Sequence, residues 1–277
     1  MGIRLTGFLQ NRNNVDNGYL RQCLGSMALI CEQIAIYDDA STEEVRPIYE
    51  EYGATVLYGS KGSFNRELYH KADLLKIALR DQPDWICWLD TDACLGLHWA
   101  DRDRAHRTLA QAGAQGVDLM FLHNLNLWRT PWWFRVDQKF NDLWHGVFWR
   151  NTGELHYQPR AGLHQQQFPF FYRDHDRPVN ATRFEDPRGQ LLHFGFASPE
   201  EIARKYFTYR AHGQKDWALN RLVDEEGMIL EPAQSEWFPR IALDQIGFVS
   251  KNKPAPMFDP QTMAGFPSLE AWREASA

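Results

Sequence analysis

Four short apolar runs at regular intervals mark the first hundred residues, and helical segments separate them. Apolar runs of this length are typical of buried β-strands. Strands that alternate with helices indicate βαβ units, in which a helix connects neighbouring parallel strands. The sequence therefore predicts an α/β fold with a mixed, mostly parallel sheet flanked by helices, with early strands at Ile3–Leu9, Gln33–Tyr37, Ala54–Tyr58 and Trp85–Leu89.

Two of the intervening helices carry their own signals. Ser41 and Glu44 match the capping-box pattern S-x-x-E, and Gly53 can end the helix that this pattern starts. Pro47 conflicts with that helix, because proline has no N–H and kinks a helix interior. The next helix is better specified, because its apolar residues recur along one face at Leu68, Ala72, Leu75 and Leu79.

The fourth strand ends in two carboxylates, Asp90 and Asp92. Residues i and i+2 of a strand point to the same face, so the two acids are expected to meet at its C-terminal end. Ligands of open α/β sheets bind beside such ends, and adjacent acids repel each other without a cation. Mg²⁺ and Mn²⁺ prefer oxygen ligands and fit this pattern. The alternative is that the two aspartates only cap the next turn.

The second half of the chain is less regular. Asp118–Leu125 predicts a further strand, and Asn151–Gln190 is polar and broken by proline and glycine, which favours loops over a cleft. Between them lies a tryptophan-rich stretch that forms either a second core, the favoured interpretation, or a stacking floor for sugar rings. Its tryptophans are Trp128, Trp132, Trp133, Trp144 and Trp149.

Regular structure is expected to return near residue 190. Gln190–Phe196 predicts a strand, and Ser198-Pro-Glu-Glu201 places serine at a helix cap, proline at the first helical position and glutamate at the third. Gly213 is expected to end that helix.

Composition limits the possible partners. A net charge of −6 over 277 residues disfavours a nucleic-acid binder, which needs a clustered excess of Lys and Arg. No segment has the apolar length of a membrane span, and no apolar signal-peptide region opens the chain. Four cysteines without a C-x-x-C pair indicate buried reduced thiols and a cytoplasmic location.

Taken together, four motifs resemble GT-A glycosyltransferases, close to the broad family-2 group. They are Gln10-Asn-Arg-Asn13 after the first strand, Asp38-Asp-Ala-Ser41 after the second, Asp90-Thr-Asp92, and His193-Phe-Gly195 before the late helix. The resemblance spans roughly residues 3 to 212. It implies a single domain with a nucleotide-sugar-binding half at 1–116. Residues 117–277 would form the acceptor-side half, with the late histidine strand and a C-terminal helix and tail.

The resemblance also implies roles for individual residues. Asp39, with Asp38 as the second choice, would contact the nucleotide base or ribose, and Gln10 or Asn11 would lie beside it. Asp90 would lie near the ribose and the metal, whereas Asp92 and His193 would ligate Mn²⁺ or Mg²⁺. A lone histidine on a strand is more often a satisfied core residue, which is the alternative for His193. The implied reaction moves a sugar from a nucleotide-diphosphate sugar, a UDP-sugar first, to a saccharide or other hydroxyl acceptor, with inversion.

Basic residues are expected to bind the donor's diphosphate. Lys61, Arg66 and Lys71 flank the start of the helix that leads to the D-x-D strand, where a helix N-terminus favours an anion. Lys205 and Arg210 are similar candidates beyond His193. Each is individually more often a solvated surface charge.

An inverting transfer needs a carboxylate that takes the proton of the acceptor hydroxyl. Asp137 in the tryptophan-rich region is the first choice, with Asp142, Glu185 and Asp186 as the other acids of that half.

Two other functions stay open. A nucleotidyltransferase would carry a glycine-rich, basic loop after its first strand, whereas here the loop Gln10–Asn14 has no glycine. A non-catalytic sugar-binding protein on the same fold is the second, because a fold does not fix a function.

Overall fold

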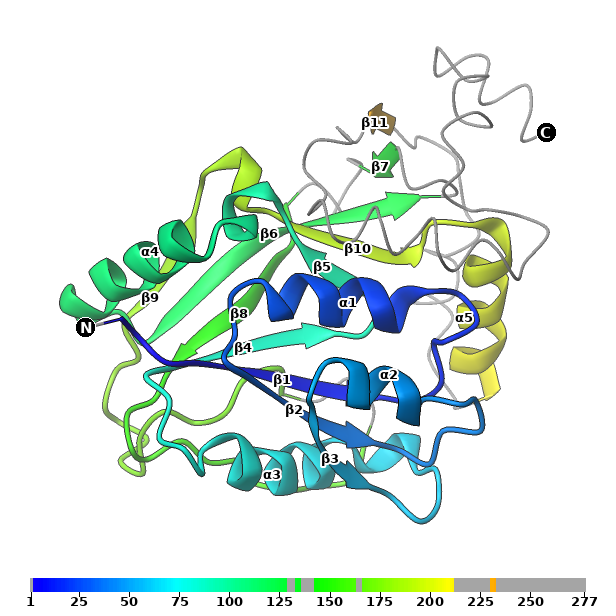
Figure 1. The fold of residues 1–277 in the computed structure, drawn as a ribbon, viewed down its shortest axis with the longest axis horizontal. Helices are drawn as coiled ribbons and strands as arrows, with labels where there is room; N and C mark the ends of the chain where they lie inside the picture. The colour runs from blue at the N-terminus through cyan, green and yellow to red at the C-terminus, as the bar shows by residue number, and fades with distance from the viewer. Residues whose placement is uncertain (1, 129–132, 136–141, 163–165, 212–229, 233–277) are drawn as a thin grey trace.

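The computed structural model describes residues 2–128, 133–135, 142–162, 166–211 and 230–232. Figure 1 shows helices packed around a twisted central sheet. The strands are β1 Leu5–Asn11, β2 Gln33–Asp38, β3 Thr55–Tyr58, β4 Trp85–Asp90, β5 Ala93–Leu95, β6 Leu119–Trp128, β7 Trp133–Arg135, β8 Trp144–Arg150, β9 Ala181–Phe184, β10 Leu191–Phe196 and β11 Leu230–Pro232. The α-helices are α1 Tyr19–Ala28, α2 Arg46–Glu51, α3 Glu67–Ala78, α4 Arg102–Ala114 and α5 Pro199–Ala211, with short 3₁₀ helices η1 Phe64–Arg66, η2 Leu97–Ala100 and η4 Pro187–Gly189.

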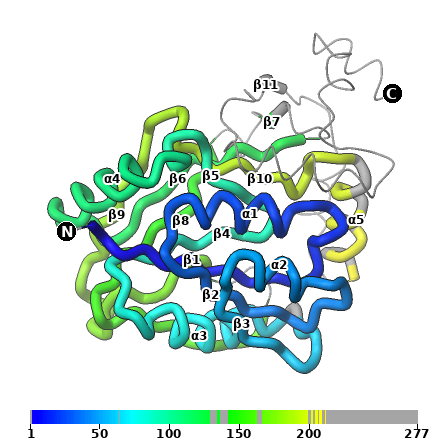
Figure 2. The backbone as a smooth tube through the Cα atoms, in the orientation of Figure 1, coloured from blue at the N-terminus to red at the C-terminus, as the bar shows by residue number. Residues whose placement is uncertain are grey.

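The first half of the chain forms the parallel part of the sheet. Strands β4, β1, β2 and β3 lie side by side in that order and run in the same direction. Figure 2 traces the chain from each of these strands through a helix to the next. The strand positions expected from the apolar runs are confirmed, with boundaries shifted by a few residues.

The second half extends the same sheet. Strand β8 lies between β4 and β6 and is antiparallel to both, and β9 pairs parallel with β6. Strand β10 is parallel to β6 and antiparallel to β5, and β7 and β11 continue the order beyond β6. The predicted α/β class, a mixed and mostly parallel sheet flanked by helices, is confirmed. Strands from both halves of the chain, 1–116 and 117–277, belong to this one sheet.

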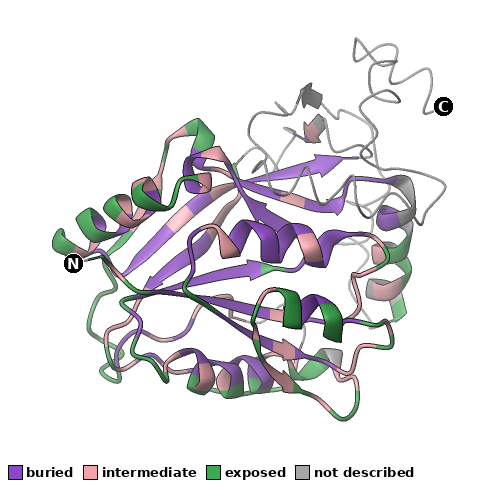
Figure 3. Ribbon diagram, in the orientation of Figure 1, coloured by how far each residue is buried: buried purple, intermediate pink, exposed green. Residues whose placement is uncertain are grey.

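Strand alternation divides the core into two layers. Leu5 and Leu9 of β1 belong to a buried cluster with side chains of α1, α2 and α4, whereas Phe8 belongs to a second cluster with side chains of α3. Period-two alternation along a strand explains this split, because neighbouring side chains point to opposite faces. Figure 3 accordingly shows buried strands flanked by helices, with exposed residues on α2, α3 and α4 and with α1 buried or half-buried.

The two helix predictions had different outcomes. Helix α3 lies where the apolar face predicted it, and Leu68 and Leu75 are buried on that face. The start at Ser41 was wrong, because α2 begins at Arg46 and Pro47 lies in its first turn. A proline there costs no intrahelical hydrogen bond, which removes the conflict seen in the sequence.

In the tryptophan-rich stretch the core interpretation is confirmed for Trp128 and Trp149, which are fully buried. Trp144 is partly exposed, and the positions of Trp132 and of the Trp133 side chain lie outside the described residues. Strands β8 and β9 were not predicted, and β9 is a short strand within the polar region expected to form loops.

The late strand and helix are confirmed as β10 and α5. The Ser198 Oγ accepts a hydrogen bond from the backbone N–H of Glu201 at 3.2 Å, as a capping serine does. The expected stop at Gly213 lies outside the described residues. All four cysteines are buried and unpaired, as expected. In the part of the chain that is described, no helix has the length and apolar character needed to span a membrane.

Candidate functional site

The C-terminal ends of the parallel strands bring together most of the residues singled out in the sequence. Asn11 at the end of β1 is in register with Asp38 at the end of β2, and Gln10 is in register with Asp90 at the end of β4. Adjacent parallel strands end at one edge of the sheet, where α/β proteins bind their ligands. This edge is therefore the candidate site.

Asp38 accepts several hydrogen bonds inside this edge. Its buried carboxylate accepts hydrogen bonds from the backbone N–H of Ser41 at 2.9 Å, from the Ser41 hydroxyl at 2.7 Å and from the Tyr49 hydroxyl at 2.6 Å. Burial and the neighbouring Asp38 raise the pKa of Tyr49. The Asn11 amide in turn donates to the Tyr49 oxygen at 2.8 Å. Asp38 and Asn11 thus hold the turn that follows β2 in place.

Asp39 lies in a separate group with Ser63, His70 and Tyr37. Its carboxylate accepts the backbone N–H of Ser63 at 3.0 and 3.1 Å, and the Ser63 Oγ lies 3.0 Å from His70 Nε2. The His70 ring stacks on Tyr37, with centroids 4.2 Å apart and planes at 10°. The sequence analysis missed Tyr37, Ser63 and His70, because no local pattern shows that the loop before α3 returns to β2.

This group makes a prediction about pH. Burial lowers the pKa of His70 below its usual value, so the unfolded chain binds a proton at higher pH than the folded protein does. The contribution of neutral His70 to the free energy of unfolding is therefore full above about pH 6.5. It decreases as the pH falls below that value. Denaturant unfolding between about pH 5 and 8 should show that the native protein loses stability on acidification relative to His70→Gln. Parallel curves for the two proteins would contradict this assignment.

The basic residues expected to bind the diphosphate differ in burial. Lys61 and Arg66 are exposed, and the Arg66 guanidinium lies 4.8 Å from the ring centroid of Tyr69. Lys71 is fully buried instead: its ammonium pairs with Glu67 at 2.5 Å and lies 4.9 Å from the Trp88 ring centroid. Diphosphate binding by this group of basic residues stays a prediction. Gln10 also contacts this helix, through the Glu67 carbonyl at 3.0 Å.

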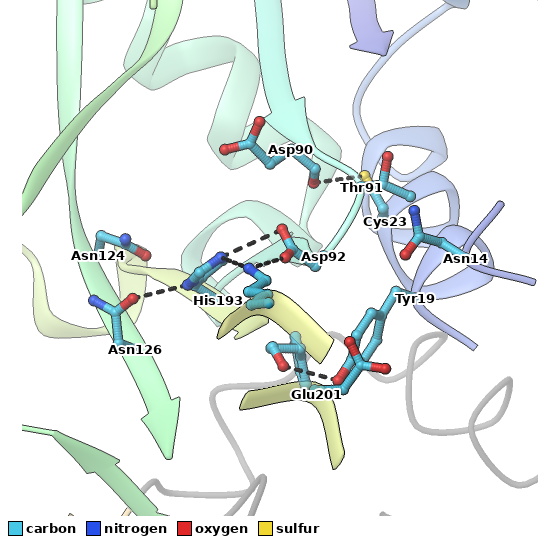
Figure 4. Close-up of polar contacts among 12 residues, drawn as sticks. Asn14, Tyr19, Cys23, Asp90, Thr91, Asp92, Asn124, Asn126, His193 and Glu201 are labelled. Carbon is cyan, nitrogen blue, oxygen red and sulfur yellow. Dashed lines mark hydrogen bonds and ion pairs between the residues drawn. The ribbon is translucent and has the colours of Figure 1, made fainter. Parts of the chain in front are cut away.

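Asp90 and Asp92 are not two side chains of one strand. Strand β4 ends at Asp90, and Thr91 and Asp92 form a turn before β5. In Figure 4 the Asp90 carboxylate points away from the Asp92 carboxylate. The expected meeting on one face was therefore wrong, because strand alternation stops where the chain turns. Partial desolvation and the charge of Asp92 raise the pKa of Asp90 to about 6.

Asp92 instead contacts His193 and Lys205, and we call these three residues the Asp92 cluster. Figure 4 shows Asp92 beside His193. The Lys205 ammonium lies 2.7 Å from Asp92 Oδ2, and His193 Nε2 lies 3.3 Å from Asp92 Oδ1. Lys205 Nζ and His193 Nε2 are 3.5 Å apart. Desolvation opposes ionisation of Asp92, but Lys205 and His193 outweigh it and hold the pKa of Asp92 well below its usual value.

Two further residues shape the Asp92 cluster. Asn126 of β6 is buried, and its Oδ1 lies 2.8 Å from His193 Nδ1. This contact fixes the orientation of the His193 ring, so that its Nε2 faces Asp92 and Lys205. The backbone of Gly195 passes so close that a Cβ there would lie 2.0 Å from Lys205 Nζ and 2.4 Å from Asp92 Oδ2.

These residues do not fit a divalent ion as they are arranged. Asp92 and His193 have suitable donor atoms, but the described residues contain no group of three or more His, Cys, Asp or Glu side chains that could hold a metal. The Lys205 ammonium contacts the same carboxylate.

The acids proposed as the general base lie in different surroundings. Asp137 lies outside the described residues, and so does the Arg210 side chain. Asp142 is exposed and accepts the Trp144 indole N–H at 2.6 Å. Asp186 caps η4 through the backbone N–H of Arg188 at 2.9 Å, and Glu185 is exposed.

No protein-family profile matches the chain, and no curated protein matches it. Among solved structures, several of TarS from S. aureus align with it. TarS 1–349 aligns at 10% identity over 99% of this chain and 79% of that one, with a TM-score of 0.47. Its complex with UDP aligns at 15% identity over 45% and 36%, with a TM-score of 0.37, and its complex with UDP-GlcNAc at 10% over 80% and 71%, with a TM-score of 0.40. The chain thus spans about a third of the chain in the UDP complex. At these values the similarity carries no argument about chemistry.

Proposed function

We propose that this protein is a glycosyltransferase that moves a sugar from a nucleotide-diphosphate sugar, with a UDP-sugar as the donor, to a saccharide or other hydroxyl acceptor. The observation that carries the proposal is the presence of two different polar groups at the C-terminal edge of the parallel strands. One, around Asp39, suits a nucleoside, and the other, the Asp92 cluster, suits the phosphates.

The group around Asp39 supports nucleoside binding. An ionised carboxylate has about four lone-pair sites, so Asp39 keeps capacity for ribose or base donors beyond its bonds to Ser63. The stacked rings of Tyr37 and His70 beside it provide a flat aromatic surface. Asp38, the second choice from the sequence, is already committed to three hydrogen bonds of the turn.

The Asp92 cluster supports diphosphate binding. The leaving group of a glycosyl transfer is a nucleoside diphosphate, which gains negative charge as the glycosidic bond breaks. A cation held in place beside that charge lowers the barrier, and Lys205 is held in place by Asp92. Asp137 stays the proposed base for an inverting transfer, on the sequence alone.

Binding of nucleotides tests this proposal. Titration calorimetry with UDP and with inorganic phosphate, each with EDTA or with Mn²⁺, is expected to show a specific UDP complex. Inorganic phosphate should bind more weakly by at least about 10-fold, because it lacks the contacts at Asp39. Asp39→Ala should weaken UDP while leaving phosphate unchanged.

The same titration separates the alternatives. A non-catalytic sugar-binding protein would bind free sugars without UDP, and a nucleotidyltransferase would prefer nucleoside triphosphates to UDP. The comparison of EDTA with Mn²⁺ also tests the expectation from the sequence that Asp90, Asp92 and His193 hold Mn²⁺ or Mg²⁺.

A further inference from the structure

The position of Lys205 is defined by contacts from three elements. Its helix, α5, directly follows β10, the strand that carries His193. Its ammonium lies 2.7 Å from Asp92 Oδ2 in the turn after β4 and 4.6 Å from the ring centroid of Phe196. Only 11% of the Lys205 side chain is exposed. The charge is therefore fixed in the site and does not extend into solvent.

Close packing against Gly195 shows how small this site is. A Cβ at residue 195 would lie 2.0 Å from Lys205 Nζ, 2.4 Å from Asp92 Oδ2 and 2.8 Å from His193 Nε2. The three polar groups thus converge on one volume beside the Gly195 backbone. An Mg²⁺-sized ion bound to Asp92 and His193 at about 2.1 Å would fall beside the ammonium, in this same volume.

Charge makes the ammonium and a divalent ion competitors. Asp92 and Lys205 neutralise each other, and His193 Nε2 lies 3.3 Å from Asp92 Oδ1 and 3.5 Å from Lys205 Nζ. A divalent ion that entered the site would bind the Asp92 carboxylate, which already pairs with Lys205, and would be repelled by the Lys205 ammonium beside it. Removing the Lys205 charge would leave Asp92 and His193 as donors for a cation.

We propose that Lys205 is the resident cation of this site, which takes the place of a divalent ion between Asp92 and His193 and binds the diphosphate of the nucleotide without metal. This inference rests on the proposed function, and it adds to it the group that holds the leaving phosphate. Asp92 and His193 act on the phosphate through Lys205, as positioning residues.

Binding of UDP and of Mn²⁺ to a variant without the charge of Lys205 tests the inference. Lys205→Met keeps an unbranched side chain but removes the ammonium, and with it the contact between that charge and the Phe196 ring. Lys76→Met on α3 is the matched control, because the Lys76 side chain is 75% exposed and pairs only locally with Asp73. UDP affinity is measured by calorimetry in EDTA and in Mn²⁺, and binding of Mn²⁺ alone is measured by electron paramagnetic resonance.

The native protein and Lys76→Met should bind UDP equally well in EDTA and in Mn²⁺, within about twofold. Lys205→Met should lose about 10- to 100-fold in EDTA, the usual worth of a hydrogen bond to a charged group. It should recover part of that loss in Mn²⁺, and should bind Mn²⁺ alone at least about 10-fold more tightly than the native protein does.

The outcomes separate the two proposals. UDP binding by the native protein that requires Mn²⁺, or equal metal-free binding by Lys205→Met, overturns the role of Lys205 and leaves the proposed function standing. No UDP binding by the native protein in either condition overturns both. Lys205→Arg keeps the charge and should retain metal-free binding, so tight Mn²⁺ binding by it or by the native protein overturns the inference even if Lys205→Met does not fold.

Discussion

Replacing Asp92 by Asn is expected to lower the free energy of unfolding by about 3 kcal/mol. The substitution keeps the shape of the side chain but leaves the Lys205 ammonium without its carboxylate. Breaking a buried ion pair by removing one partner costs roughly 3–5 kcal/mol, because the remaining charge stays desolvated. The lower end applies here, since 16% of the Asp92 side chain and 11% of the Lys205 side chain are exposed. Denaturant unfolding of both proteins measures the difference.

An exposed ion pair of the same type provides the control. Asp73 pairs with Lys76 at 2.7 Å on α3, and both side chains are more than half exposed. Asp73→Asn should therefore change stability by less than about 0.5 kcal/mol. The double variant Asp92→Asn/Lys205→Met should be more stable than Asp92→Asn alone, because it removes the uncompensated charge. A double variant whose loss of stability equals the sum of the losses of Asp92→Asn and Lys205→Met would show that the two residues are not coupled.

Adding one methyl group at Gly195 is expected to disrupt the same cluster by a different route. The Cβ of Gly195→Ala would lie within 2.8 Å of atoms of Lys205, Asp92 and His193, so at least one of them must move. Inserting a methyl group into a packed site costs about 1–3 kcal/mol. If the phosphate site needs these groups in place, UDP binding should also weaken by at least about 10-fold in calorimetry.

A second glycine shows what the substitution costs where there is space. A Cβ at Gly113 in α4 would meet no atom closer than 3.6 Å, the Trp85 Nε1. Gly113→Ala should leave UDP binding unchanged and raise stability by up to about 1 kcal/mol, because alanine is the better helix former. Native-like UDP binding by Gly195→Ala would mean that nucleotide binds elsewhere.

Local sequence signals predicted the wrong start for the helix after β2 because distant partners compete for the same groups. The Ser41 hydroxyl donates to Asp38 and accepts the backbone N–H of Asn13, and the Glu43 carboxylate accepts the backbone N–H of Val15. These bonds hold Ser41 and Glu43 in the turn between β2 and α2, against the loop that follows β1. A capping box describes only bonds within one segment, so the sequence pattern could not show the competition.

The sequence by itself determined the elements whose signals are local. Apolar runs placed β1 to β4, because a buried strand needs no partner information to be recognised, and a one-sided apolar pattern placed α3. The order of these elements placed Asn11, Asp38 and Asp90 at one edge of the sheet, since parallel strands end together.

Only the tertiary structure decided which of these groups act together. Lys205 meets Asp92 across 113 residues of sequence, and Asn126 meets His193 across 67. Both contacts depend on β10, which pairs with β5 and β6 and leads directly into α5. Strand pairing over such separations is set by packing of the whole sheet, whereas periodicity and capping report only neighbours along the chain. For the same reason a lysine that the sequence offered as one of five candidates becomes, in the fold, the charged partner of the D-x-D motif.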